Sequence, residues 1–298
     1  MKVEEGYVTW NGNRTYYRMV GTCREGRYPL VLLHGGPGST HNYFELLDEL
    51  AADGRSVIMY DQLGCGKSDT GFHPELWNME TWKRELMALR EHLGLKRIHL
   101  LGQSFGGMLA LSYVCDEKPE GIESLILSST LPSSELWARE QHRMIRFLPE
   151  PMQQAIARAE ETGNYEGKEY LEANEEFMRR HCAPDVTPES PECLRREKGA
   201  GRDSYLTAWG PNEFHPMGNL KDFEYRDRLA EIRIPALIIS GTNDLCTPLV
   251  AKTMADGISD SRWELFENSR HMPFLEEREK YLKVVGTWME EQERNKEQ

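Results

Sequence analysis

The chain has 298 residues, the size of one large domain or two small ones. Apolar residues make up 39% of it and charged residues 29%, a balance that excludes a disordered tail protein, a fibre and a transmembrane bundle. Because 36 Lys and Arg stand against 49 Asp and Glu, the net charge is −13, and general binding to the phosphates of nucleic acids is not expected.

The cysteines and the N-terminal sequence indicate in which cellular compartment the protein is expected to work. Six scattered cysteines form no CxxC pair, which argues against a zinc ribbon or a thioredoxin-like site. The opening sequence MKVEEGYVTWNG lacks an apolar signal region, and no apolar run approaches the roughly 20 residues of a membrane helix. We therefore expect a cytoplasmic protein with reduced thiols, no membrane partner, and no metal or other cofactor. The oligomeric state stays open.

Short apolar runs recur along the first part of the chain. A hairpin comes first, with strands at 7–10 and 15–20 joined by an Asn-Gly turn. The next runs are apolar almost throughout, as expected of strands covered on both faces. They lie at 29–33, 56–60, 97–101 and 122–127, with helical patterns between them at 82–93 and 106–114. This alternation predicts a parallel sheet with right-handed crossovers.

The alternation then stops and later resumes. Residues 138–180 are rich in Glu, Arg, Gln and Ala and are expected to be helical, and the proline-containing stretch 182–192 is expected to be a loop. Further strands are predicted at 235–240 and 263–267, followed by a helix at 276–290 and a solvated helix end at 290–298. The chain is thus predicted to hold one α/β core, residues 1–130 and 230–298, interrupted by a helical lid, residues 131–229.

The strongest motif is Gly102-Gln103-Ser104-Phe105-Gly106, a G-x-S-x-G between a predicted strand and a predicted helix. A serine on such a sharp turn projects its hydroxyl away from the sheet edge, and the glycines remove side chains that would clash in the turn. The N-terminus of the following helix favours developing negative charge. We therefore expect Ser104 to be a nucleophile.

A serine hydroxyl needs a base, and the base needs an acid that orients it. Asp244 follows the strand that ends at residue 240, and His271 lies in the loop after the last strand. Either residue alone could be an ordinary turn or loop residue. Together they reach the carboxyl edge of the sheet in the order serine, acid, histidine, which predicts a catalytic triad.

Acyl transfer also needs hydrogen-bond donors for the oxyanion. The sequence His34-Gly35-Gly36-Pro37-Gly38 follows an early strand, where the second donor of such a site is found. We expect the backbone N–H groups of Gly36 and Phe105 to form the oxyanion hole, although the glycines could equally serve a structural turn.

Four separated motifs together resemble the proline iminopeptidase group of the α/β-hydrolase superfamily, the serine aminopeptidases that include the tricorn-interacting factor. They are HGGPG at 34–38, DQLGCGKS at 61–68, GQSFGG at 102–107 and GPNEF at 210–214. The resemblance implies an α/β-hydrolase fold, a mostly parallel sheet with an inserted helical lid. Within that fold, Asp61 is expected to orient the turn that supports the oxyanion loop, and Cys246 to lie in the core.

The resemblance also implies a role for Glu213. In relatives a glutamate at this place binds the α-ammonium of the substrate, because a buried cation must meet a carboxylate. Relatives commonly have a second acidic residue after the triad aspartate, where this chain has Leu245. An aromatic cluster, Tyr205, Trp209 and Phe214, could line a pocket for a proline ring or could simply pack the lid.

These observations predict a serine aminopeptidase that releases one N-terminal residue, preferably proline, from short peptides through an acyl-enzyme. Leu245 motivates an alternative, an amino-acid amidase or small-ester hydrolase with the same triad. A non-catalytic binding protein on a hydrolase fold is a third possibility, opposed by the presence of the whole triad and both glycine turns. The serine at the turn after the strand 97–101 argues against an epoxide hydrolase or a dehalogenase, because those enzymes use aspartate at this turn. A lid that closes over the pocket would limit the length of the peptide.

Overall fold

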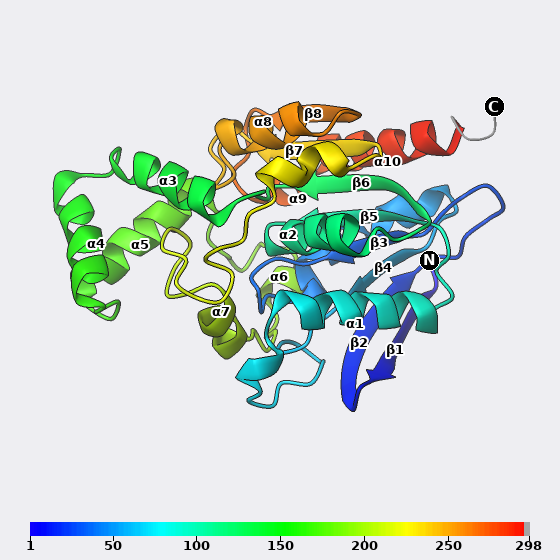
Figure 1. Cartoon of the computed structure of the whole chain (residues 1–298), viewed down its shortest axis with the longest axis horizontal. Helices are drawn as coiled ribbons and strands as arrows, with labels where there is room; N and C mark the ends of the chain where they lie inside the picture. The colour runs from blue at the N-terminus through cyan, green and yellow to red at the C-terminus, as the bar shows by residue number, and fades with distance from the viewer. Residues whose placement is uncertain (295–298) are drawn as a thin grey trace.

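Eight strands form one sheet in the computed structural model, which describes residues 1–294 (Figure 1). Their order across the sheet is β1-β2-β4-β3-β5-β6-β7-β8. The hairpin strands β1 and β2 are antiparallel, β2 is antiparallel to β4, and all other neighbours are parallel. The predicted fold class, a mostly parallel α/β-hydrolase sheet, is confirmed. The strands are β1 (Val3–Trp10), β2 (Asn13–Val20), β3 (Leu30–Leu33), β4 (Val57–Tyr60), β5 (Ile98–Gln103), β6 (Ile122–Ser128), β7 (Ala236–Gly241) and β8 (Ser261–Phe266).

The central strands are apolar on both faces because helices cover both. Along β3, Val31 and Leu33 belong to one buried cluster, and Leu30 and Leu32 to the other. The first cluster is covered by α1 (Met79–His92), α2 (Phe105–Ser112) and α8 (Pro248–Gly257). The second is covered by the 3₁₀ segment His41–Asp53, α9 (Pro273–Glu276) and α10 (Arg278–Arg294).

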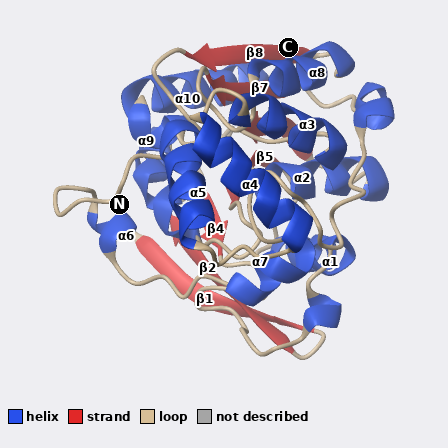
Figure 2. Cartoon of the chain, turned by 90° about the vertical axis from the view of Figure 1, so that its left-hand side faces the viewer, coloured by secondary structure: helices blue, strands red, loops and turns tan. Residues whose placement is uncertain are grey.

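A helical insertion separates β6 from β7. Figure 1 shows it at one end of the sheet, and Figure 2, seen from that end, shows α4 and α5 in front of the strands. The two ends of the insertion are held together, since Ser133 and Glu224 form an antiparallel bridge and the Ser134 N–H donates to the Phe223 carbonyl at 2.9 Å. Its helices are α3 (Ser134–Ile145), α4 (Glu150–Thr162), α5 (Lys168–His181), α6 (Glu192–Arg195) and α7 (Arg202–Ala208).

The structure departs from the sequence-based expectations in a few places. The 3₁₀ segment 41–53 and the short helix α7 were not predicted, although Phe44, Leu47 and Leu50 of the first follow a helical apolar period. The expected solvated helix end at 290–298 is wrong in part: Glu293 is buried and pairs with Arg55 and Arg27. Residues 295–298 of that stretch lie outside the described residues. Among residues 1–294, no helix combines the length and the apolar character needed to cross a bilayer.

Candidate active site

Ser104 occupies a strained turn between β5 and α2. Its φ is 55° and its ψ is −123°, a conformation that residues other than glycine rarely adopt. The turn is anchored because the Ser104 N–H donates to the Ser128 carbonyl at 3.0 Å and the Thr130 hydroxyl donates to the Ser104 carbonyl at 2.6 Å. A side chain at Gly102 would collide with the backbone of Gly106, so the tight turn requires the glycine.

Asp244 and His271 meet at the carboxyl ends of β7 and β8. The His271 ring contributes Nδ1 to Oδ1 of Asp244 at 2.7 Å, and both residues are almost fully buried. The His271 N–H donates to the Cys182 carbonyl at 3.0 Å, which fixes the loop that carries the ring. With Nδ1 held by the carboxylate, Nε2 is the nitrogen left to exchange a proton with a substrate or nucleophile.

Asp244 receives hydrogen bonds from three further donors. The Gly241 N–H and the Cys246 N–H donate to it at 3.0 and 2.8 Å, and the Ser129 hydroxyl donates at 2.6 Å. These bonds compensate the burial of the carboxylate and hold it in one orientation. Ser129 was missed by the sequence analysis, although it directly follows β6 and so lies at the same sheet edge.

The expected oxyanion donors lie on either side of Ser104. Gly36 follows β3, and Phe105 is the first residue of α2. Within the described range, no carbonyl or side chain accepts a hydrogen bond from either N–H. Gly35 is fixed by Tyr43, whose hydroxyl accepts from the Gly35 N–H at 2.6 Å. The Phe105 side chain points elsewhere and packs against Trp82.

A cavity of about 270 Å³ brings most of the predicted residues together. Ser104 and His271 line it, as do Gly36 from the glycine-rich loop after β3 and Glu213 and Tyr205 from the insertion. The Ser104 hydroxyl forms no hydrogen bond to another residue of the described range. Catalytic hydrogen bonds are often long in the absence of substrate and tighten when the substrate binds.

Glu213 faces this cavity without a cationic partner. Its Oε1 accepts from the Tyr205 hydroxyl at 2.8 Å, while its backbone carbonyl accepts from the Trp137 indole at 2.7 Å. Burial raises the pKa of the Glu213 carboxyl, an effect opposed by the Tyr205 hydrogen bond and by the nearby imidazole of His271. No lysine or arginine of residues 1–294 forms an ion pair with it.

The three aromatic residues of the predicted cluster divide into two groups. Tyr205 lines the cavity, but Trp209 and Phe214 do not. Phe214 is fully buried, with its ring 5.4 Å from that of Phe177 inside the insertion. Trp209 packs edge-to-face against Trp137, which in turn packs against the His271 ring. Trp209 and Phe214 therefore belong to the buried packing around the cavity and not to its lining.

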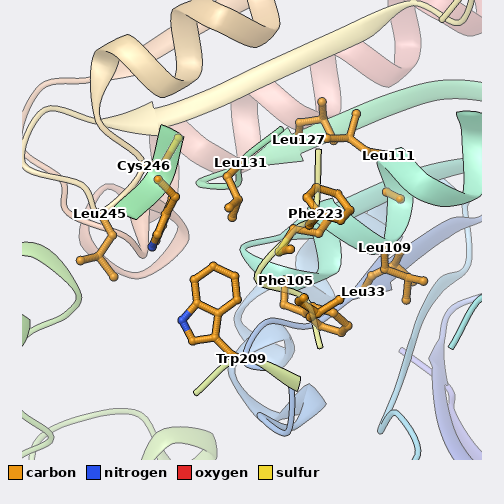
Figure 3. Close-up of a cluster of buried hydrophobic side chains, with 14 of the residues drawn as sticks. Leu33, Phe105, Leu109, Leu111, Leu127, Leu131, Trp209, Phe223, Leu245 and Cys246 are labelled. Atoms are coloured by element: carbon orange, nitrogen blue, oxygen red, sulfur yellow. The ribbon is translucent and has the colours of Figure 1, made fainter. Parts of the chain in front are cut away.

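Leu245 forms an apolar part of the cavity wall next to the triad. It is fully buried by protein and holds the Gln141 side chain through its backbone carbonyl at 2.7 Å. Figure 3 shows Leu245 and Cys246 in a buried cluster with Trp209. Cys246 is buried in the core, as expected.

Asp61 forms hydrogen bonds to the segments that flank the glycine-rich loop and the loop after β4. Its carboxylate accepts from the His41 N–H at 2.9 Å and from the Lys67 N–H at 2.9 Å, and it also contacts the His41 ring. It thereby ties the loop after β4 to the start of the 3₁₀ segment that follows the glycine-rich loop. In the part of the chain that the structure describes, no group of three or more His, Cys, Asp or Glu is arranged to hold a metal ion.

Comparisons with known proteins show which family the chain belongs to. Residues 28–278 match the family model of the alpha/beta hydrolase fold. The chain is 61% identical to a proline iminopeptidase of Clostridium botulinum, over 97% of this chain and 99% of that protein. It is 58% identical to a proline iminopeptidase of Lactobacillus helveticus, over 98% and 99%. A crystal structure of the Mycobacterium smegmatis proline iminopeptidase, 32% identical, superposes with a TM-score of 0.85 and coverage of 97% and 99%. The chain therefore belongs to the α/β-hydrolase fold family and, within it, to the proline iminopeptidases.

Proposed function

We propose that this chain is a serine aminopeptidase that releases an N-terminal residue, proline by preference, from short peptides. Ser104 attacks the carbonyl of the N-terminal residue while His271 Nε2 takes its proton. Asp244 holds the imidazole in the tautomer that this step needs. The N–H groups of Gly36 and Phe105 receive the oxyanion.

The second half of the reaction follows from the first. His271 returns the proton to the leaving amine as the peptide C–N bond breaks, which leaves an ester between Ser104 and the released residue's carbonyl. A water molecule then attacks this ester, with His271 again as the base, and regenerates the free serine. Every proton in the cycle passes through one nitrogen, so no cofactor is needed.

One observation carries the choice of an aminopeptidase: the Glu213 carboxylate lies in the Ser104 cavity without a cation. A partly buried carboxylate with a raised pKa is costly to maintain unless it has a charged ligand to bind. The free α-ammonium of a peptide is the ligand that fits this position next to a serine nucleophile. A hydrolase for neutral esters would gain nothing from such a group.

The experiment compares a proline arylamide with its N-acetylated form. The native enzyme is expected to cleave only the free amine, and Glu213→Gln should lower kcat/KM for it by about 100-fold, because a charge pair in a desolvated site is lost. Glu161→Gln, an exposed glutamate on α4, is the matched control and should behave as the native enzyme. Equal turnover of the acetylated substrate would refute the proposal.

A second candidate, an amino-acid amidase or small-ester hydrolase, is favoured by Leu245. Its apolar side chain forms the cavity wall where a second carboxylate would strengthen the grip on the ammonium. Faster hydrolysis of proline amide or of short acyl esters than of proline peptides by the same preparation would favour this candidate.

We also propose that residues 131–229 act as a lid over the core formed by 1–130 and 230–298. The cavity supports this division, since Cys182, Tyr205 and Glu213 from the insertion line it together with Ser104 and His271 from the core. A lid of this kind limits the substrate to short chains. Release of proline from the N-terminus of a folded protein at the rate seen for a tripeptide would contradict it.

We propose the cytoplasm as the working compartment. All six cysteines are free thiols, and Cys65, Cys115, Cys193 and Cys246 are buried in the fold. Such a protein has no use for an oxidising environment. Alkylation of all six thiols, after denaturation of protein taken directly from cells, would agree with this location, and disulfide-linked cysteines would not.

A further inference from the structure

The cavity around Ser104 carries one lysine or arginine side chain among the described residues that line it, Arg202. It also carries one carboxylate, Glu213. The nucleophile therefore shares its cavity with one cationic and one anionic residue. A ligand with an ammonium and a carboxylate would match both.

The backbone at Arg202 is held tightly against the catalytic loops. Arg202 is the first residue of α7, and the preceding N–H, of Gly201, donates to the Gly38 carbonyl at 2.7 Å. A side chain at Gly201 would collide with the carbonyl of Gly64, so α7 begins in close contact with both glycine-rich loops. The starting point of the Arg202 side chain is thus fixed relative to the oxyanion loop.

The guanidinium of Arg202 is free to bind a ligand. It forms no ion pair or hydrogen bond with any of residues 1–294. Arg196, six residues earlier, is by contrast paired with Glu45 and Glu192. Arg202 lies between two cavities: it lines the one that holds Ser104 and also a neighbouring one, which the adjacent acid Asp203 lines as well, but the two side chains form no ion pair.

Helix α7 carries both Arg202 and the tyrosine that contacts Glu213. Tyr205 stands three positions after Arg202, which brings the two residues to neighbouring places on the helix surface. The Tyr205 hydroxyl donates to Glu213. Helix α7 thus carries Arg202 and, through Tyr205, also contacts the Glu213 carboxylate.

We propose that Arg202 binds the terminal carboxylate of the substrate's leaving group, so that the enzyme prefers dipeptides with a free C-terminus. This inference rests on the proposed function, in which Glu213 holds the ammonium. An extended dipeptide spans roughly 7 Å, a length that a cavity of about 270 Å³ accommodates. Cleavage then releases the second residue as a free amino acid from the guanidinium. Arginine suits this role because its planar fork matches a carboxylate bidentately.

The experiment compares Pro-Gly with Pro-Gly amide, two substrates that differ only in the terminal charge. For the native enzyme, kcat/KM for the acid is expected to exceed that for the amide by roughly 5- to 10-fold, because Arg202 is exposed and its pairing partly screened. In Arg202→Gln the ratio should fall to within about 2-fold, with the change mainly in KM. Arg202→Lys should keep an intermediate ratio, since it retains the charge without the fork.

Arg233→Gln is the matched control. Arg233 is also an exposed arginine, but it lines a different cavity, so its removal changes the net charge equally and should leave the acid-to-amide ratio intact. A native enzyme that cleaves both substrates equally well, or an Arg202→Gln variant that keeps the native ratio, would overturn the inference and leave the aminopeptidase proposal standing. Failure of the native enzyme to cleave either substrate would instead overturn the proposed function. Because the ratio is read within each variant, a general loss of activity does not obscure the result.

Discussion

The Nδ1 atom of His271 lies 2.7 Å from Oδ1 of Asp244, and the Ser129 hydroxyl lies 2.6 Å from Oδ2 of the same carboxylate. Asp244 comes from the loop after β7, His271 from the loop after β8 and Ser129 from the residue after β6. Three neighbouring parallel strands therefore end in one hydrogen-bonded unit. This unit fixes the imidazole before a substrate arrives, as an efficient general base requires.

Asp244→Asn should lower kcat by about 10³- to 10⁴-fold, because the amide presents an N–H toward Nδ1 and favours the wrong imidazole tautomer. KM should change much less, since Asp244 does not line the cavity. Steady-state kinetics with a proline arylamide measures both constants. A kcat within 10-fold of the native value would show that Asp244 is not the orienting acid.

Ser129→Ala should have a smaller effect on the same constant. The variant removes one of the donors to Asp244 but leaves the backbone N–H groups of Gly241 and Cys246 in place. Loss of a hydrogen bond to a charged group costs about 1.5 to 3 kcal/mol. Only part of this energy should raise the activation barrier, so we expect kcat to fall by about 5- to 20-fold. An unchanged kcat in the alanine variant would assign Ser129 to folding alone.

The strand ends were predictable because the strands themselves are visible as apolar runs. β3 and β5 are buried on both faces, and residues that follow them, such as Ser104, inherit a defined place at the sheet edge. Helix α7 was not predictable, because seven residues without an apolar stripe give no period. Its position comes from long-range contact with Gly38, and so the place of Arg202 became visible only in the structure.

The neighbourhood of Glu213 shows a second limit. Adjacent residues in an irregular segment turn in different directions, so the motif could not say which side chains face the cavity. The structure directs Glu213 toward it and buries Phe214 on the other side. Distinguishing the two requires the packing of Phe177, which lies far away in the chain.

The activity on peptides should decrease as the pH is lowered, and the decrease should begin at a higher pH than it would if Glu213 had the pKa of an ordinary glutamate. Burial raises the pKa of Glu213, and the protonated carboxyl cannot pair with an ammonium. As the pH falls through this raised pKa, kcat/KM for a proline arylamide should decrease through KM. A pH profile of KM measures the effect. In Glu213→Gln this component of the profile should disappear, and an acid limb identical in the two enzymes would show that another group causes it.

A short acyl ester provides the control for this profile. It carries no ammonium, so its KM should not follow the ionisation of Glu213, whereas any titration of the triad would affect both substrates. If the ester and the arylamide lost activity at the same pH and to the same extent, the pH dependence would belong to the chemistry and not to recognition of the amine.

Glu85 should make the fold less stable as the pH rises. It lies on α1 with no exposed surface, and accepts hydrogen bonds from the Thr15 hydroxyl and from the Leu63 N–H. Burial raises its pKa from 4.5 to about 8, an effect opposed by these two hydrogen bonds and increased by the charge of Asp61. Between these two values the folded state keeps a proton that the unfolded state has lost. The free energy of unfolding should therefore fall as pH rises across this window, by at most about 1.4 kcal/mol per pH unit from this group.

Glu85→Gln tests this dependence, because the amide stays neutral at every pH and still accepts from Thr15 and Leu63 through its oxygen. Urea denaturation between pH 5 and 9, a range chosen to cover roughly this window, should show a smaller decline in the variant, and the variant should gain on the native protein toward alkaline pH. Glu91→Gln, at an exposed position of the same helix, is the matched control and should keep the native slope. Equal slopes for native protein and Glu85→Gln would show that Glu85 is ionised in the fold at neutral pH.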